Sequence, residues 1–268
     1  MSFLKALLFP PPPSIFVSAM SVISFTSLAI AGASEVMGRH LRYSKFWDAA
    51  GGAGLGVKQI RISSRAGMLL IYAPAMIAAV AAPFAVPGLL DGVRSQLVTA
   101  AVAIHFAKRV LEVLFLHSYS GQMILDSIIT ISLSYFLFAV TVIYSQHLVQ
   151  NTPEPAVNST YVGVVLFLVG ISGNFYHHYL LSRLRAKGEK VYKMPKGGLF
   201  GWVICPHYLF EITIFIGISL MSQTVYSLSF TLGSTAYLLG RSHVTRRWYL
   251  TKFEDFPKDV KALVPYVF

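Results

Sequence analysis

Three side chains that can donate or accept protons stand close together near residue 210. His207 and Glu211 are four residues apart, and Tyr208 and Glu211 are three apart, so a helix would place them on neighbouring positions of one face. Pro206 stands just before them and predicts a kinked helix, because a proline inside a helix removes a backbone donor. A glutamate just inside an apolar run indicates function, since burying its charge in lipid is costly. The alternative is a structural role, in which Tyr208 lies at the membrane interface with its hydroxyl in contact with water.

A second polar group lies about a hundred residues earlier. His105, Lys108, Arg109 and Glu112 recur at spacings of three and four within an apolar run, which places them on one face of a helix. Lys108 and Glu112 are spaced to form a purely structural bridge one turn apart. Ionisable residues inside a membrane span also mark functional sites, and both interpretations stay open here.

A third group contains two adjacent histidines. Asn174, His177 and His178 share a helical face, either as part of a site or as histidines wetted at the membrane interface. A di-iron centre would need several clustered histidines, and none of the eight histidines forms an HxxHH box. The single cysteine, Cys205, excludes a disulfide framework and a multi-cysteine metal site. We therefore predict no metal.

The composition predicts that membrane helices position these groups. Of 268 residues, 55% are hydrophobic and 12% charged, where a soluble domain carries about 25% charged residues. Apolar runs long enough to cross a bilayer cover residues 14–33, 67–86, 95–116, 125–148 and 161–181. The run 209–240 would be about 48 Å long as one helix, so we divide it near residues 222–223 and begin its first part near Leu199. We predict an all-α, polytopic transmembrane bundle of seven helices.

The basic residues predict how this bundle is oriented. The segments 34–66, 182–207 and 241–268 hold 18 of the 22 lysines and arginines, whereas 150–161 holds none. Loops rich in lysine and arginine stay in the cytosol. Four predicted helices separate the first basic segment from the second, and two separate the second from the third. Because both numbers are even, all three segments lie on the cytosolic side. The N-terminus is then lumenal and the C-terminus cytosolic. This rule also accounts for the net charge of +11, and we expect no nucleic-acid partner because no aromatic-interleaved basic motif is present.

Three runs resemble a known family. They are KGGLF with CPHYLFE at 196–200 and 205–211, RWYLTKFEDFPK at 247–258, and KALVPYVF at 261–268. Together they are similar to the steroid 5α-reductase family, which includes very-long-chain enoyl-CoA reductases and polyprenol reductases. The resemblance is strong over about the last hundred residues. It implies a seven-helix enzyme of the endoplasmic reticulum membrane that holds NADPH in a cavity facing the cytosol.

The resemblance also implies roles for individual residues. Glu211 matches the acidic residue of the family's motif, His207 stands where the family usually has asparagine, and His178 stands where the steroid enzymes have aspartate. The positions that match cofactor-contacting residues are Asn174, Arg185, Tyr192, His207, Arg241 and Tyr249. We accordingly divide the chain into N-terminal helices on the substrate side (1–148) and a C-terminal domain with the NADPH site (149–268).

The substrate side departs from the steroid reductases. Tyr72 stands where they carry a glutamate, and Phe106 where they carry a tyrosine, whereas the pattern around Lys108, Arg109 and Glu112 resembles the enoyl-CoA reductases. The implied reaction is reduction of a carbon–carbon double bond conjugated to a carbonyl, in a 3-oxo-4-ene steroid or a trans-2-enoyl-CoA.

A neutral donor must stabilise the charge that develops on the carbonyl oxygen of such a substrate, and tyrosine, with a pKa of about 10, stays protonated at neutral pH. We predict Tyr208 as this donor, oriented by Glu211, and Tyr72 as the second candidate.

Two other functions fit parts of the sequence. An isoprenylcysteine-type membrane methyltransferase has a related proline–aromatic–glutamate element, and would bind S-adenosylmethionine instead of NADPH. A non-enzymatic lipid-binding or transport protein would use Glu211 and Arg109 to line a pathway and would have no fixed nucleotide site.

Overall fold

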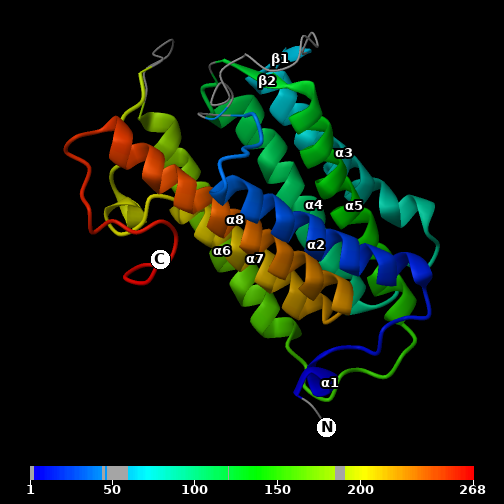
Figure 1. Cartoon of the computed structure of the whole chain (residues 1–268). Coiled ribbons are helices and arrows are strands. Elements are labelled where there is room, and N and C mark those ends of the chain that lie inside the picture. Colours follow the sequence, from blue (N-terminus) through cyan, green and yellow to red (C-terminus); the bar gives the residue numbers. More distant parts are fainter. Residues whose placement is uncertain (1–2, 44–45, 47–59, 120, 185–190) are drawn as a thin grey trace.

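The computed structural model describes residues 3–43, 46, 60–119, 121–184 and 191–268, and within them it is a helical bundle (Figure 1). The long helices are α2 (Ile15–Val36), α3 (Ser64–Ala85), α4 (Val93–Leu111), α5 (Leu125–Val149), α6 (Thr160–Arg183), α7 (Pro206–Ser222) and α8 (Val225–Lys252). The shorter elements are α1 (Phe3–Leu7), the π-helical turn η2 (Glu112–Leu116), the 3-10 turn η3 (Gly198–Gly201), and strands β1 (Arg61–Ser63) and β2 (Gln122–Ile124). Each predicted span has its helix, which confirms the all-α bundle.

Apolar side chains on the outside of the bundle identify it as a membrane protein. The helices α2, α3, α5 and α6 are each long and apolar enough to cross a bilayer, and α7 is a shorter apolar helix. Large hydrophobic residues such as Ile77, Phe84, Leu133 and Val165 are more than half exposed. Soluble monomers rarely expose so much contiguous apolar surface, so lipid is the solvent of this face.

The long apolar run divides where the sequence predicted. Gln223 has a left-handed backbone (φ 51°) and its N–H closes the last turn of α7 on the Ser219 carbonyl. Thr224 then caps α8 by accepting from the Ser227 N–H. The Gln223 side chain also accepts a hydrogen bond from the Arg94 guanidinium at 2.8 Å. The α7–α8 turn is thereby tied to the start of α4.

The predicted start of the sixth span is wrong, and so is the kink at Pro206. Residues 198–201 form the separate turn η3, and α7 begins only at Pro206. The reason is that the intervening segment pairs with the C-terminal tail, because the Ile204 N–H donates to the Lys261 carbonyl at 2.9 Å and the Cys205 N–H to the Ala262 carbonyl at 3.2 Å. Proline then occupies the first helical position, where its missing N–H has no partner to lose.

A short two-stranded sheet that was not predicted from the sequence joins two helix starts. Strands β1 and β2 are antiparallel, with Arg61 opposite Ile124, and they lead directly into α3 and α5. They lie at one end of the bundle, opposite α1 and the N-terminus (Figure 1). The sheet fixes the relative heights of α3 and α5, which both contribute to the polar site described below.

Glycines let two pairs of helices approach closely. Helices α2 and α8 lie side by side (Figure 1), and a Cβ on Gly32 would lie 2.5 Å from the backbone oxygen of Ala236. Helices α6 and α7 meet in the same way, since a Cβ on Gly163 would lie 2.6 Å from the Gly217 oxygen. Small residues at such seams allow the backbone contact that holds helices together in lipid.

We therefore expect Gly32→Ala to destabilise the protein by about 1–3 kcal/mol, because the added methyl group meets backbone that cannot rotate away. Gly201→Ala is the matched control, since a Cβ there has nothing within 4 Å. The measurement is thermal unfolding of the purified proteins in one detergent. Equal melting temperatures for both variants would contradict a tightly packed α2–α8 seam.

Candidate active site

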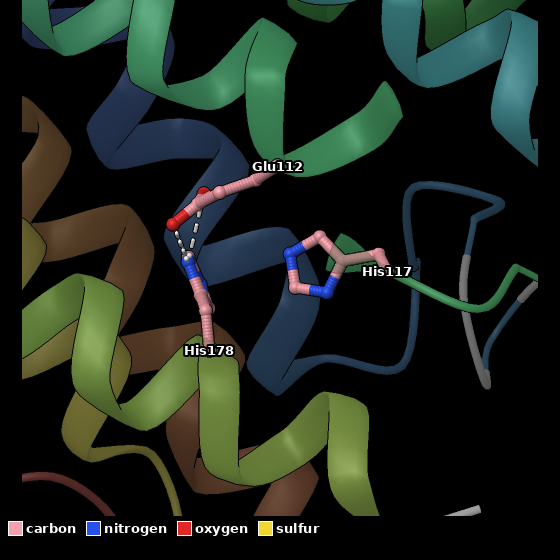
Figure 2. A group of neighbouring side chains, drawn as sticks. All are labelled: Glu112, His117 and His178. Carbon is pink, nitrogen blue, oxygen red and sulfur yellow. Dashed lines mark hydrogen bonds and ion pairs between the residues drawn. The ribbon is translucent and has the colours of Figure 1, made fainter. Parts of the chain in front are cut away.

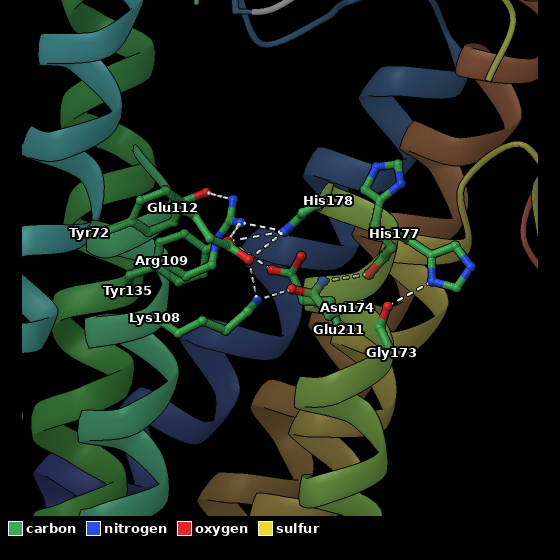
Figure 3. A network of polar contacts seen from close by, with 11 residues as sticks. Tyr72, Lys108, Arg109, Glu112, Tyr135, Gly173, Asn174, His177, His178 and Glu211 are labelled. Atoms are coloured by element: carbon green, nitrogen blue, oxygen red, sulfur yellow. Dashed lines mark hydrogen bonds and ion pairs between the residues drawn. The ribbon is translucent and has the colours of Figure 1, made fainter. Parts of the chain in front are cut away.

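A buried carboxylate is the centre of the polar site. Glu112 is 2% exposed and lies where α4 passes into the π-helical turn η2. Its oxygens accept from the Lys108 amine at 3.0 Å and from the Arg109 guanidinium, and lie 3.0 Å from Nδ1 of His178 on α6. The Lys108–Glu112 bridge predicted from the sequence is present, but it is one arm of a larger network (Figure 3).

Arg109 carries this network to α3. Its Nη2 donates to the Tyr72 hydroxyl at 2.5 Å, and its guanidinium lies over the Tyr72 ring at 4.5 Å from the centroid. Because a guanidinium can only donate, the Tyr72 oxygen acts as the acceptor here, and the phenolic proton is left free for another partner. Tyr72 is 6% exposed, so that partner must lie inside the protein.

Lys108 carries the network to α7. Its amine donates to Oδ1 of Asn174, a fully buried residue of α6, and Nδ2 of Asn174 donates to the His207 carbonyl at 2.8 Å. The carbonyl of His207 lies in the first turn of α7. Three groups that are far apart in the sequence, near residues 108, 174 and 207, are thus joined by consecutive hydrogen bonds. Figure 3 shows the link between Lys108 and Asn174.

Glu211 enters the same site from α7. It is 7% exposed, and among the described residues the hydrogen bond to its carboxylate comes from the Tyr135 hydroxyl on α5, at 3.2 Å. Tyr208 occupies the same part of α7, where its ring packs against the His207 ring with centroids 4.3 Å apart. From the sequence we paired Glu211 with Tyr208 and missed Tyr135. The usable signal was that Tyr135 is a tyrosine in the middle of an apolar span.

Arg241 belongs to a neighbouring cluster. Its side chain is 1% exposed, and Nη1 lies 2.7 and 2.9 Å from the two oxygens of Glu35 on α2. The guanidinium also lies between the rings of Tyr43 and Phe46, 4.3 Å from each centroid. The sequence analysis missed Glu35, although a carboxylate near the end of an apolar helix was a usable signal. His40 adds a contact of 2.7 Å from its Nδ1 to the same carboxylate.

Aromatic residues surround the predicted cofactor tyrosines. Tyr249 is buried and stacks on Phe253 with centroids 5.6 Å apart, and it also contacts the Trp248 ring. The Tyr192 ring also packs against Trp248, with ring centroids 4.9 Å apart. The structure thus brings Tyr192 and Tyr249 to one tryptophan. Arg185, the remaining predicted cofactor residue, lies outside the described residues.

Two buried groups and one partly exposed histidine have the composition of a metal site. Ligand atoms of Glu112, His117 and His178 lie within 4.8 Å of one another (Figure 2). Burial lowers the pKa of His117 to about 4, so it is neutral at pH 7. However, the Glu112 carboxylate already faces two fixed cations, Lys108 and Arg109, which would repel a divalent ion. This charge balance favours an ion-pair network, and the absence of a metal stays a prediction.

The fold and the site together define a class: a polytopic helical membrane protein with a polar, internally hydrogen-bonded site. The model of the family described as 3-oxo-5-alpha-steroid 4-dehydrogenase matches residues 121–268, more than half of the chain. The chain therefore belongs to this family.

Similar proteins include reductases of two kinds. The 3-oxo-5-alpha-steroid 4-dehydrogenase 2 of Macaca fascicularis is 41% identical over 107 residues, which cover 40% of this chain and 42% of that protein. Steroid 5-alpha-reductase DET2 of Gossypium hirsutum is 39% identical over 107 residues, covering 40% and 42%. The probable very-long-chain enoyl-CoA reductase art-1 of Caenorhabditis elegans is 31% identical over 180 residues, covering 64% and 58%. The matched part thus spans about two fifths to three fifths of these relatives.

We expect Glu112→Ala to cost about 3–5 kcal/mol of stability, because it leaves Lys108 and Arg109 buried without their counter-ion. Glu254→Ala is the matched control, since Glu254 is exposed after the end of α8. Thermal unfolding in detergent measures both. A Glu112 variant as stable as the Glu254 variant would show that the network does not hold the helices together.

Proposed function

We propose that this chain is a membrane reductase that uses NADPH to reduce a carbon–carbon double bond conjugated to a carbonyl, in a steroid or lipid of the 3-oxo-4-ene or trans-2-enoyl-CoA type. The observation that carries the proposal is the Tyr72 hydroxyl, which accepts from Arg109 and keeps its own proton free inside a buried site. Membership of a family of steroid dehydrogenases and similarity to an enoyl-CoA reductase support it. They favour it over the methyltransferase and transport alternatives.

The residues proposed to hold NADPH are Asn174, Arg185, Tyr192, His207, Arg241 and Tyr249. Their chemistry suits a dinucleotide, because guanidinium forks bind phosphates and aromatic rings offer stacking surfaces for the bases. Asn174 lies in the network that reaches Glu112, whereas Tyr192 and Tyr249 lie around Trp248. NADPH supplies the hydride when it is bound. In this proposal Asn174 would hold the nicotinamide end, and Tyr192 and Tyr249 would hold the adenosine end.

The role proposed for Tyr72 is to hold the substrate carbonyl. Hydride addition to the β-carbon places negative charge on the carbonyl oxygen, and a preorganised donor stabilises that charge. Tyr72 meets this requirement because Arg109 donates a hydrogen bond to its hydroxyl oxygen and packs its guanidinium over the ring, which holds the ring in place. Tyr208, the first candidate donor predicted from the sequence, becomes the second candidate here; it lies on the α7 side of the site next to His207. Glu211 is proposed to act with these phenols at the reacting end.

We further propose that the protein lies in the endoplasmic reticulum membrane, with its C-terminus in the cytosol. The three basic segments support this orientation. A steroid or lipid would then arrive from the bilayer and NADPH from the cytosol. The polar site lies where the proposed N-terminal part (1–148), through α3 to α5, meets the proposed C-terminal domain (149–268), through α6 and α7.

The first experiment measures NADPH consumption by microsomes that contain the chain. We expect oxidation to depend on an added 4-ene-3-oxo steroid or long trans-2-enoyl-CoA, because the proposed reaction consumes one NADPH for each double bond. Microsomes with Glu112→Ala are the control for endogenous reductases. NADPH binding without turnover of either compound would overturn the substrate class, and failure to bind NADPH would overturn the reductase.

The second experiment compares two tyrosines. We expect Tyr72→Phe to lower turnover at least about 100-fold, the usual contribution of a hydrogen-bond donor to the developing oxyanion, while NADPH binding is unchanged. Tyr208→Phe should cost less than about tenfold, because its ring packing on His207 survives the loss of the hydroxyl. Steady-state kinetics of both variants measure this. The opposite ranking would return the donor role to Tyr208.

A further inference from the structure

Two phenols lie side by side in the site, and their hydrogen bonds are opposite in kind. The Tyr72 hydroxyl accepts from the Arg109 guanidinium at 2.5 Å, whereas the Tyr135 hydroxyl donates to Oε1 of Glu211 at 3.2 Å. The two rings pack with centroids 5.7 Å apart and an interplanar angle of 33°. Helices α3 and α5, which pack along each other, contribute one tyrosine each.

Tyr135 is placed for chemistry and not only for packing. The neighbouring ring of Phe106, with its centroid 5.4 Å away, fills the α4 side and has no proton to give. Phe106 is fully buried, whereas Tyr135 is only partly buried. The phenol therefore combines a fixed ring, a carboxylate bonded to its hydroxyl, and an accessible surface. A structural tyrosine would also bond its hydroxyl, but any acceptor would serve, whereas the acceptor here is a carboxylate of the site.

The proposed reaction needs donors at two atoms. Hydride addition to the β-carbon must be followed by protonation of the α-carbon, while the developing charge lies on the carbonyl oxygen. These two atoms are separated by only two bonds, so two donors must lie next to each other. Tyr72 is held by a cation, which suits a group that stabilises negative charge. Tyr135 is bonded to a carboxyl group, which suits a group that gives up a proton and regains it.

We propose that Tyr135 is a catalytic residue that protonates the α-carbon of the substrate; this rests on the proposed reductase function. As the hydride forms the new C–H bond at the β-carbon, the two π electrons of the double bond pass into the enolate. The Tyr135 hydroxyl then turns from Glu211 to the substrate, and its O–H bond breaks as the α-carbon gains its hydrogen. The phenolate regains a proton through Glu211, which takes it from water. Overall one hydride and one proton saturate the double bond, and no further oxidant or reductant is needed.

The test is Tyr135→Phe, with Tyr144→Phe as the matched control on the same helix. Tyr144 is 39% exposed and packs its ring edge-on against Phe16, away from the polar site. We expect Tyr135→Phe to lose at least about 100-fold in turnover of the active enone, with unchanged NADPH binding. We also expect a larger solvent deuterium isotope effect, because proton transfer becomes slower. Tyr144→Phe should match the unmodified protein in all three measurements.

The outcomes separate this proposal from the proposed function. If the unmodified chain turns over an enone and Tyr135→Phe matches Tyr144→Phe, the Tyr135 assignment is overturned and the reductase function stands. A Tyr135→Phe variant with weakened NADPH binding and an unchanged isotope effect overturns it equally, since that result indicates a structural role. If the unmodified chain consumes no NADPH, the reductase and the Tyr135 assignment fail together.

A second measurement avoids the loss of the hydroxyl. Incorporation of 3-fluorotyrosine at position 135 keeps the bond to Glu211 and makes the phenol more acidic. We expect the solvent deuterium isotope effect on turnover to change, because fluorination alters the acidity of the phenol that gives up the proton. An isotope effect identical to that of the unmodified protein would overturn the assignment even if Tyr135→Phe fails to fold.

Discussion

The ion pairs around Glu112 are the constraint on which the rest of the structure depends. An unpaired carboxylate in an apolar interior costs several kcal/mol, so this group needs cations from its own helix and a partner from α6. Lys108 and Arg109 supply the cations, and His178 the partner. Once they are paired, α4 and α6 have a fixed register, and Arg109 extends it to Tyr72 on α3. The charge requirement thereby positions the groups that carry the proposed chemistry.

Close backbone packing makes this network geometrically possible. Glycines on α6 and α7 bring those helices into backbone contact, so that Asn174 reaches the His207 carbonyl and Glu211 faces the same space. The two-stranded sheet sets α3 beside α5, which places the Tyr72 and Tyr135 rings together. Lipid offers no hydrophobic drive between helices, so small residues and buried polar bonds must supply the specificity.

The two charged clusters suggest a division of labour in the proposed enzyme. The Glu112 network, with its phenols, lies among helices whose outer faces are apolar, where a lipid or steroid would be found. The Glu35–Arg241 pair joins α2 to α8 near the start of the basic tail. A lipid substrate and a soluble cofactor have to meet, and the proposed enzyme would bring them together between these two clusters. The C-terminal tail contributes by pairing with residues 202–205, which fixes where α7 begins.

The sequence by itself determined what depends on local spacing and composition. The lengths of the apolar runs predicted the seven helices. The left-handed turn at Gln223 lies in the run that was too long for a single membrane crossing. The i,i+4 spacing predicted the Lys108–Glu112 bridge. Only the tertiary structure decided which distant groups meet. Tyr135 with Glu211 and Glu35 with Arg241 are separated by 76 and 206 residues, and no periodicity connects such positions. The effect of Pro206 was likewise decided by the tail, because a proline kinks a helix only if the residues before it are already helical.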